Sequence, residues 1–219
     1  MTVAIAPISS APRAEVQREH IVLRNVTWDT YLRLRRECND LDMTFDHGAL
    51  EIMPPSPAHE KIGKFIARLV ETLTLELRIP IVGLGRTTWN SESILRGLEA
   101  DECYYIAHAD WATGRESFNL VNDFPPDLAI QVDIYSNSLN KEDIYRELRI
   151  PELWRYGAGK LTVRLLDATG KYADSSHSAC LPMLPVSMIE SVVARRNTAN
   201  DTHLIGEFQM WMRQALILK

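Results

Sequence analysis

The longest regular pattern in the chain is a helical stripe of apolar residues. Between residues 59 and 78, apolar side chains recur at spacings of three and four, which is typical of a helix that buries one face. The stripe consists of Ile62, Phe65, Ile66, Leu69, Val70 and Leu73. Pro80 follows it, and proline ends helices. The pattern predicts a helix over residues 59–78.

A different pattern covers residues 127–133, where apolar and polar side chains alternate in steps of two. Period two indicates a strand. The apolar face, formed by Leu128, Ile130, Val132 and the following Ile134, is predicted to pack in a core. The other face carries Asp127, Gln131 and Asp133. Gln131 and Asp133 are two residues apart, so their side chains are separated by two residues of strand rise.

Other segments complete a mixed α/β pattern. A helix over 27–36 with Thr27 as N-cap and a hairpin over 43–53 come before the long helix. Strands are predicted at 81–89, 101–106, 127–133 and 152–156, with a helix over 139–148 capped by Ser138 before the last of them. A hairpin over 161–173 and a helix over 204–216 follow. The central order is therefore helix, three strands, helix, strand.

Length and composition indicate one globular domain. The chain has 219 residues and 46% hydrophobic residues, so we expect a single domain over residues 21–219 after a frayed tail at 1–20. No run of eighteen apolar residues occurs and no signal peptide is recognisable, which predicts a cytoplasmic protein without a membrane span. The net charge of −5 excludes an overall basic field for nucleic acid, so any such binding must use local groups.

Four polar residues form a candidate site, namely Asp101, Gln131, Asp133 and Lys141. Adjacent strands can bring oxygen ligands together around a hard divalent cation, and a nearby lysine can offset charge on a phosphodiester. The alternative is that Gln131 and Asp133 face solvent and Lys141 is an ordinary first-turn residue of a helix. His59, at the start of the long helix, is expected to be solvated or to cap it.

Five ordered motifs resemble the Uma-two family of putative restriction endonucleases, a branch of the PD-(D/E)XK nuclease superfamily. They cover most of the chain and are Gly48–Pro57 with His59-Glu60, Leu98–Ile106, Pro125–Asp133, Ser136–Lys141 and Ile150–Tyr156. The resemblance implies a restriction-endonuclease-like αβββαβ core with a mixed central sheet flanked by helices. The first helix and hairpin, and the last hairpin and helix, would be additions to that core.

The resemblance also implies roles for individual residues. Asp101, position 131 and the main-chain carbonyl of Val132 would bind Mg²⁺ or Mn²⁺, and Lys141 would be the catalytic lysine. Glu60 would add an outer contact to the metal site. Asp127 would assist the site or only cap its loop.

One residue departs from the family pattern, because Gln131 stands where the family has glutamate. A neutral amide binds magnesium more weakly than a carboxylate and removes one negative charge from the site. Asp133, where the superfamily commonly has its strand lysine, could compensate as a ligand. We therefore expect the fold to be intact and metal binding to be weakened.

The leading function is a metal-dependent endonuclease that hydrolyses duplex DNA through metal-activated water, acting as a homodimer because both strands must be cut. Arg86, Arg96 and Arg115 could line the DNA groove. The alternative is a catalytically inactive protein of the same fold that binds nucleic acid or a protein partner. A purely structural protein would depend on exposed aromatics, but Trp154, Tyr156 and Trp211 are more typical of a core.

Overall fold

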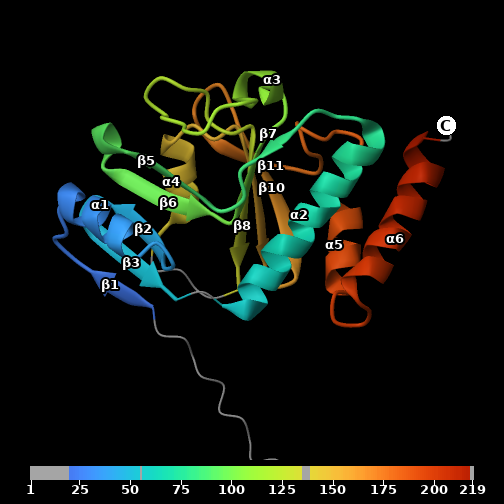
Figure 1. The fold of residues 1–219 in the computed structure, drawn as a ribbon, viewed down its shortest axis with the longest axis horizontal. Coiled ribbons are helices and arrows are strands. Elements are labelled where there is room, and N and C mark those ends of the chain that lie inside the picture. Colours follow the sequence, from blue (N-terminus) through green and yellow to red (C-terminus); the bar gives the residue numbers. More distant parts are fainter. Residues whose placement is uncertain (1–19, 55, 135–138, 218–219) are drawn as a thin grey trace, which may run out of the picture.

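The computed structural model describes residues 20–54, 56–134 and 139–217, which form two β-sheets covered by helices (Figure 1). The smaller sheet is antiparallel throughout. Its strand order is β1 (Ile21–Leu23), β3 (Ala49–Met53), β2 (Asp42–Asp46), β6 (Arg96–Ala100) and β5 (Thr87–Ser91). Helix α1 (Trp28–Glu37) packs on this sheet through Trp28 and Tyr31.

The larger sheet is mixed. Its order is β11 (Tyr172–Ser175), β10 (Lys160–Leu166), β9 (Glu152–Gly157), β8 (Leu128–Asp133), β7 (Glu102–Tyr105) and β4 (Val82–Gly83). Strands β8 and β9 are parallel, whereas the other neighbours are antiparallel. The crossover between the two parallel strands contains helix α4 (Lys141–Glu147).

Helices cover both faces of the larger sheet. One face packs against α2 (Pro57–Leu77), next to β8, and α5 (Val186–Ala194), next to β10. Helix α6 (Asp201–Met212) packs on α2 and is the outermost helix in Figure 1. The other face packs against α4 through Ile144 and Tyr145. The remaining short elements are α3 (Ala109–Ala112), the 3₁₀ turn η1 (Glu92–Ile94) and the π-helical turn η2 (Arg213–Ile217).

The predicted mixed α/β core is confirmed, although five strands, β4 to β8, rather than three lie between α2 and α4 in the described ranges. Helix α2, strand β8, helix α4 and strand β9 lie where the hydrophobic pattern places them, and the hairpins β2–β3 and β10–β11 are present. Thr27 caps α1 as expected, because its hydroxyl accepts a hydrogen bond from the N–H of Thr30 at 3.2 Å. Trp154 and Tyr156 are buried, in agreement with a core role.

Some of the helices and strands predicted from the sequence, and some of their boundaries, were wrong. The segment 81–89 is not one strand, because the chain turns at Gly85 with φ +62° and places β4 and β5 in different sheets. Strands β1 and β6 and helix α5 were not predicted. The N-cap of α4 is Asn140, whose side chain accepts from the N–H of Asp143. Ser138 lies outside the described residues, as do residues 1–19 of the predicted tail.

None of the helices in the described ranges is both long enough and apolar enough to cross a membrane.

Candidate functional site

Asp101 lies where the chain passes from the smaller sheet to the larger one. Strand β6 ends at Ala100 and β7 begins at Glu102, so Asp101 occupies the bend between them rather than the start of a strand. Its N–H donates to the carbonyl of Ile130 at 3.1 Å. Its carboxylate turns toward the end of β8, where Oδ2 accepts from the N–H of Val132 at 2.6 Å.

Gln131 is buried beside this carboxylate, with 1% of its surface exposed. Its Nε2 donates to Asp101 Oδ2 at 3.1 Å and to the carbonyl oxygen of Val132 at 3.4 Å. Its Oε1 accepts from the hydroxyl of Tyr145 at 2.9 Å. The alternative that Gln131 faces solvent is therefore wrong, because α4 covers this face of the strand.

His59 belongs to the same cluster. It lies in the first turn of α2, is 8% exposed, and places Nε2 2.8 Å from the Val132 carbonyl oxygen and 3.4 Å from Asp101 Oδ1. A carbonyl can only accept, so Nε2 carries a hydrogen. Burial lowers the pKa of His59, but the hydrogen bond and negative charge of Asp101 outweigh it and raise the pKa to about 9. The expectation of a solvated histidine was wrong.

Gly63 faces the site from α2, one turn after His59. A Cβ atom built at this position would be 3.8 Å from both Asp101 Cβ and Val132 Cγ2, an ordinary van der Waals distance. The space between helix and strand here therefore matches the size of one methyl group.

Lys141 is the first residue of α4 and is 7% exposed. Its ammonium forms no hydrogen bond or ion pair with any residue that the structure describes. Residues four apart share a helix face, so Lys141 lies on the side of α4 from which Tyr145 reaches Gln131. The structure thus places Lys141, which has no charge partner among the described residues, on the helix face that covers Gln131.

Asp133 is engaged elsewhere. Its Oδ2 accepts from Arg155 Nε at 3.0 Å and Nη2 at 2.7 Å, and Arg155 also pairs with Glu142 at 2.9 Å. Arg155 extends from β9, the parallel neighbour of β8. The guanidinium therefore balances the charge that Asp133 could offer to a cation.

The two outer residues differ in their distance from the cluster. Asp127 accepts from the N–H groups of Ile106 and His108 at 2.7 and 3.0 Å and contacts His108 Nδ1 at 2.6 Å. It immediately precedes β8, about 13 Å before Gln131 at the usual strand rise, so the structure does not bring it to the cluster. Glu60 is exposed and lies 3.5 Å from His59 Nδ1, which makes it an outer partner of that histidine.

The three arginines expected to face DNA already have partners within the protein. Arg86 pairs with Asp42 and Glu99, and Arg96 pairs with Asp46 at 2.8 Å. Arg115 stacks on Trp111 and lies 3.5 Å from Asp123. None of the three presents an uncommitted charge to a ligand.

The cluster, as arranged, does not fit a divalent cation. It contains one carboxylate, that of Asp101, where the resemblance implies two. The oxygen atoms that would bind the metal already accept hydrogen bonds from Gln131, Val132 and His59. Throughout the described ranges, no three His, Cys, Asp or Glu side chains are grouped so that they could hold a metal ion.

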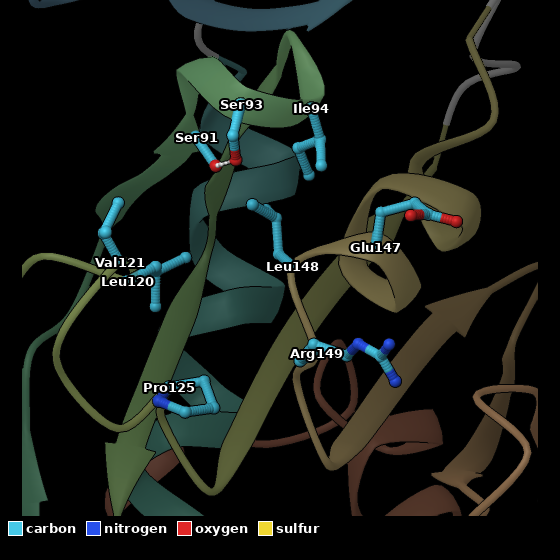
Figure 2. Close-up of a pocket in the computed structure, with 9 residues that line it drawn as sticks. All are labelled: Ser91, Ser93, Ile94, Leu120, Val121, Pro125, Glu147, Leu148 and Arg149. Carbon is cyan, nitrogen blue, oxygen red and sulfur yellow. Dashed lines mark hydrogen bonds between the residues drawn. The ribbon is translucent and has the colours of Figure 1, made fainter.

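A separate pocket of about 310 Å³ lies at the far end of α4 (Figure 2). Mostly apolar side chains from several segments form its walls. The hydroxyls of Ser91 and Ser93 lie 2.9 Å apart, in the hydrogen bond drawn as a dashed line in Figure 2. The lining residues are Ser91, Ser93, Ile94, Leu120, Val121, Pro125, Glu147, Leu148 and Arg149. No predicted site residue is among them, so this pocket is distinct from the candidate site.

Two residues of the cluster were given no role in the site from the sequence, namely His59, which lies in the first motif, and Tyr145, which lies in none of the motifs. A signal existed for each. Position 59 continues the buried stripe of α2 at the spacing of Ile62 and Ile66, and Tyr145 follows Lys141 by four residues on one helix face.

The mixed sheet with helices on both faces is consistent with a restriction-endonuclease-like fold. A family model described as Uma2, putative restriction endonuclease, matches residues 28–193, and the chain belongs to this family. A search of curated proteins found no match. Among solved structures, the chain is similar to a putative nuclease from Anabaena variabilis, with 14% identity and a TM-score of 0.48 over 77% of this chain and 99% of that chain.

Proposed function

We propose that the protein is a nuclease of restriction type, acting on duplex DNA, in which Gln131 strongly weakens metal-dependent hydrolysis. Membership of the Uma2 family supports the nuclease class. The observation that carries the proposal is the 3.1 Å hydrogen bond from Gln131 Nε2 to Asp101 Oδ2. A hydrogen-bond donor faces the carboxylate at the point where a nuclease of this type would need an oxygen ligand.

Lys141 supports retention of an interaction with phosphate. Lys141 is 7% exposed, and its ammonium pairs with no charged group among the described residues. A buried ammonium is unfavourable unless a counter-charge balances it. A DNA phosphate would do so, and the lysine would offset the charge that grows on the phosphodiester during cleavage. Any cleavage that remains would depend on Mg²⁺ or Mn²⁺, the cations implied for this class.

A second candidate is a binding module on the same fold that has lost catalysis completely. It is favoured by the hydrogen bonding of the Gln131 amide, whose oxygen and nitrogen both have partners inside the protein. A homodimer in the cytoplasm remains our proposal for the assembly and its location, since cleavage of two strands suits two-fold symmetry.

The test is cleavage of supercoiled and linear duplex DNA in Mg²⁺ and in Mn²⁺ by wild type, Asp101→Ala and Gln131→Glu. We expect slow or absent cleavage by wild type, faster cleavage by Gln131→Glu and none by Asp101→Ala. If none of the three proteins cleaves DNA but all of them still bind duplex DNA, the binding module is supported instead. Rapid wild-type cleavage that Gln131→Glu does not increase would contradict the weakening by Gln131.

A further inference from the structure

The oxygen atoms expected to bind a cation are held by N–H groups of the chain itself. Asp101 Oδ2 accepts from the Val132 N–H at 2.6 Å and from Gln131 Nε2 at 3.1 Å. The Val132 carbonyl accepts from His59 Nε2 at 2.8 Å and from Gln131 Nε2 at 3.4 Å. The Gln131 amide nitrogen therefore bridges Asp101 and the Val132 carbonyl, the two groups that the family resemblance implies as metal ligands.

The chemistry of the neighbours determines which way the amide faces. An ionised carboxylate and a carbonyl only accept hydrogen bonds, so both require the nitrogen of Gln131. The hydroxyl of Tyr145 can donate, and it donates to Oε1 at 2.9 Å. Reversing the amide would leave its oxygen against two acceptors in a buried site, which is unfavourable.

We infer that the Gln131 amide replaces a divalent cation structurally, so that this site is complete and stable without metal. The inference deepens the proposed function and rests on it for the identity of the metal-binding oxygens. Two amide hydrogens hold Asp101 and the Val132 carbonyl together, as a cation would by its charge.

A glutamate at position 131 would reverse this situation. Its carboxylate would face that of Asp101 in a buried site, and two like charges at hydrogen-bonding distance repel strongly. Such a pair needs a proton or a cation between its members. Gln131→Glu is therefore predicted to make folding stability depend on metal, whereas the wild type is stable with or without it.

The experiment is thermal unfolding of wild type and Gln131→Glu in EDTA, in Mg²⁺ and in Mn²⁺. We expect the wild-type melting temperature to be the same in all three conditions. Gln131→Glu should melt several degrees lower in EDTA and recover on addition of either metal. If Gln131→Glu does not fold in EDTA, folding restored by Mg²⁺ or Mn²⁺ also supports the inference. Failure of either metal to restore folding overturns it.

Gln209→Glu is a matched control. The amide of Gln209 in α6 also donates to a carboxylate, that of Glu76 in α2, at 3.3 Å, but this pair lies outside the candidate site. Its melting temperature should not depend on metal. A wild type that metal stabilises as much as it stabilises Gln131→Glu would overturn the inference, as would a Gln131→Glu protein of unchanged stability in EDTA. The readout needs no DNA, so failure of Gln131→Glu to cleave would count only against the proposed function.

Discussion

The hydroxyl of Tyr145 donates to Oε1 of Gln131 at 2.9 Å, joining helix α4 to the centre of strand β8. Burial raises the pKa of Tyr145 well above its usual value, so the hydroxyl stays protonated and able to donate. The contact connects the residue that departs from the family pattern with the helix that carries Lys141.

Tyr145→Phe removes this donor and leaves the Gln131 oxygen buried without a partner. We expect the free energy of unfolding to fall by about 1–3 kcal/mol. Urea unfolding monitored by tryptophan fluorescence measures the change. Unchanged stability would mean that the hydroxyl does not hold the amide.

Lys141→Met tests whether the buried lysine meets a DNA phosphate. Loss of one phosphate contact should weaken binding of duplex DNA to a similar degree for every sequence, and should reduce the slope of log K against log salt by about one. Fluorescence anisotropy at several salt concentrations measures both. Lys171→Met, on the exposed β10–β11 hairpin, is the control, and an equal effect of the two variants would argue against phosphate binding by Lys141.

Glu152→Ala tests a buried carboxylate with a structural role. Glu152 is 1% exposed and accepts from Trp154 Nε1 at 2.6 Å and from the N–H groups of Ala179 and Cys180 at 2.9 Å each. Alanine would leave these three N–H donors without an acceptor, so we expect the free energy of unfolding to fall by about 3 kcal/mol or more. Chemical unfolding checks this, and a loss below about 1 kcal/mol would show that water replaces the carboxylate.

Gly157→Ala tests the close approach of the two parallel strands. A Cβ atom at Gly157 would lie 2.9 Å from the main-chain oxygen of Asp133, its partner across the pair. The strands would have to separate, at a cost of about 1–3 kcal/mol. Gly206→Ala is the control, because no atom lies within 4 Å of its Cβ position and alanine favours the helix α6. Equal stability of the two variants would contradict the packing argument.

The sequence predicted those parts of the fold that depend on local periodicity. Helix α2 and strand β8 each bury a regular apolar face, so their patterns are visible without tertiary information. Strand β6 was missed because its buried Glu99 looks like a surface residue. In the fold, Arg35 and Arg86 reach that carboxylate from other elements and balance its charge.

The candidate site was predicted in the same partial way. Asp101, Gln131 and Lys141 were identified from motifs, but their partners were not. His59 contacts Val132, which lies 73 positions later in the sequence. Arg155 forms an ion pair with Asp133, 22 positions earlier, and so balances the charge that Asp133 could offer to a cation. These contacts depend on how helices and strands pack, which no local pattern records.

The most direct test of the account is calorimetric titration of wild type and Gln131→Glu with Mn²⁺ in the absence of DNA. We expect no measurable binding by the wild type, or binding at least tenfold weaker than that of Gln131→Glu, because the amide nitrogen faces the ligand oxygens and the site lacks one carboxylate. Equal Mn²⁺ affinity of the two proteins would contradict it.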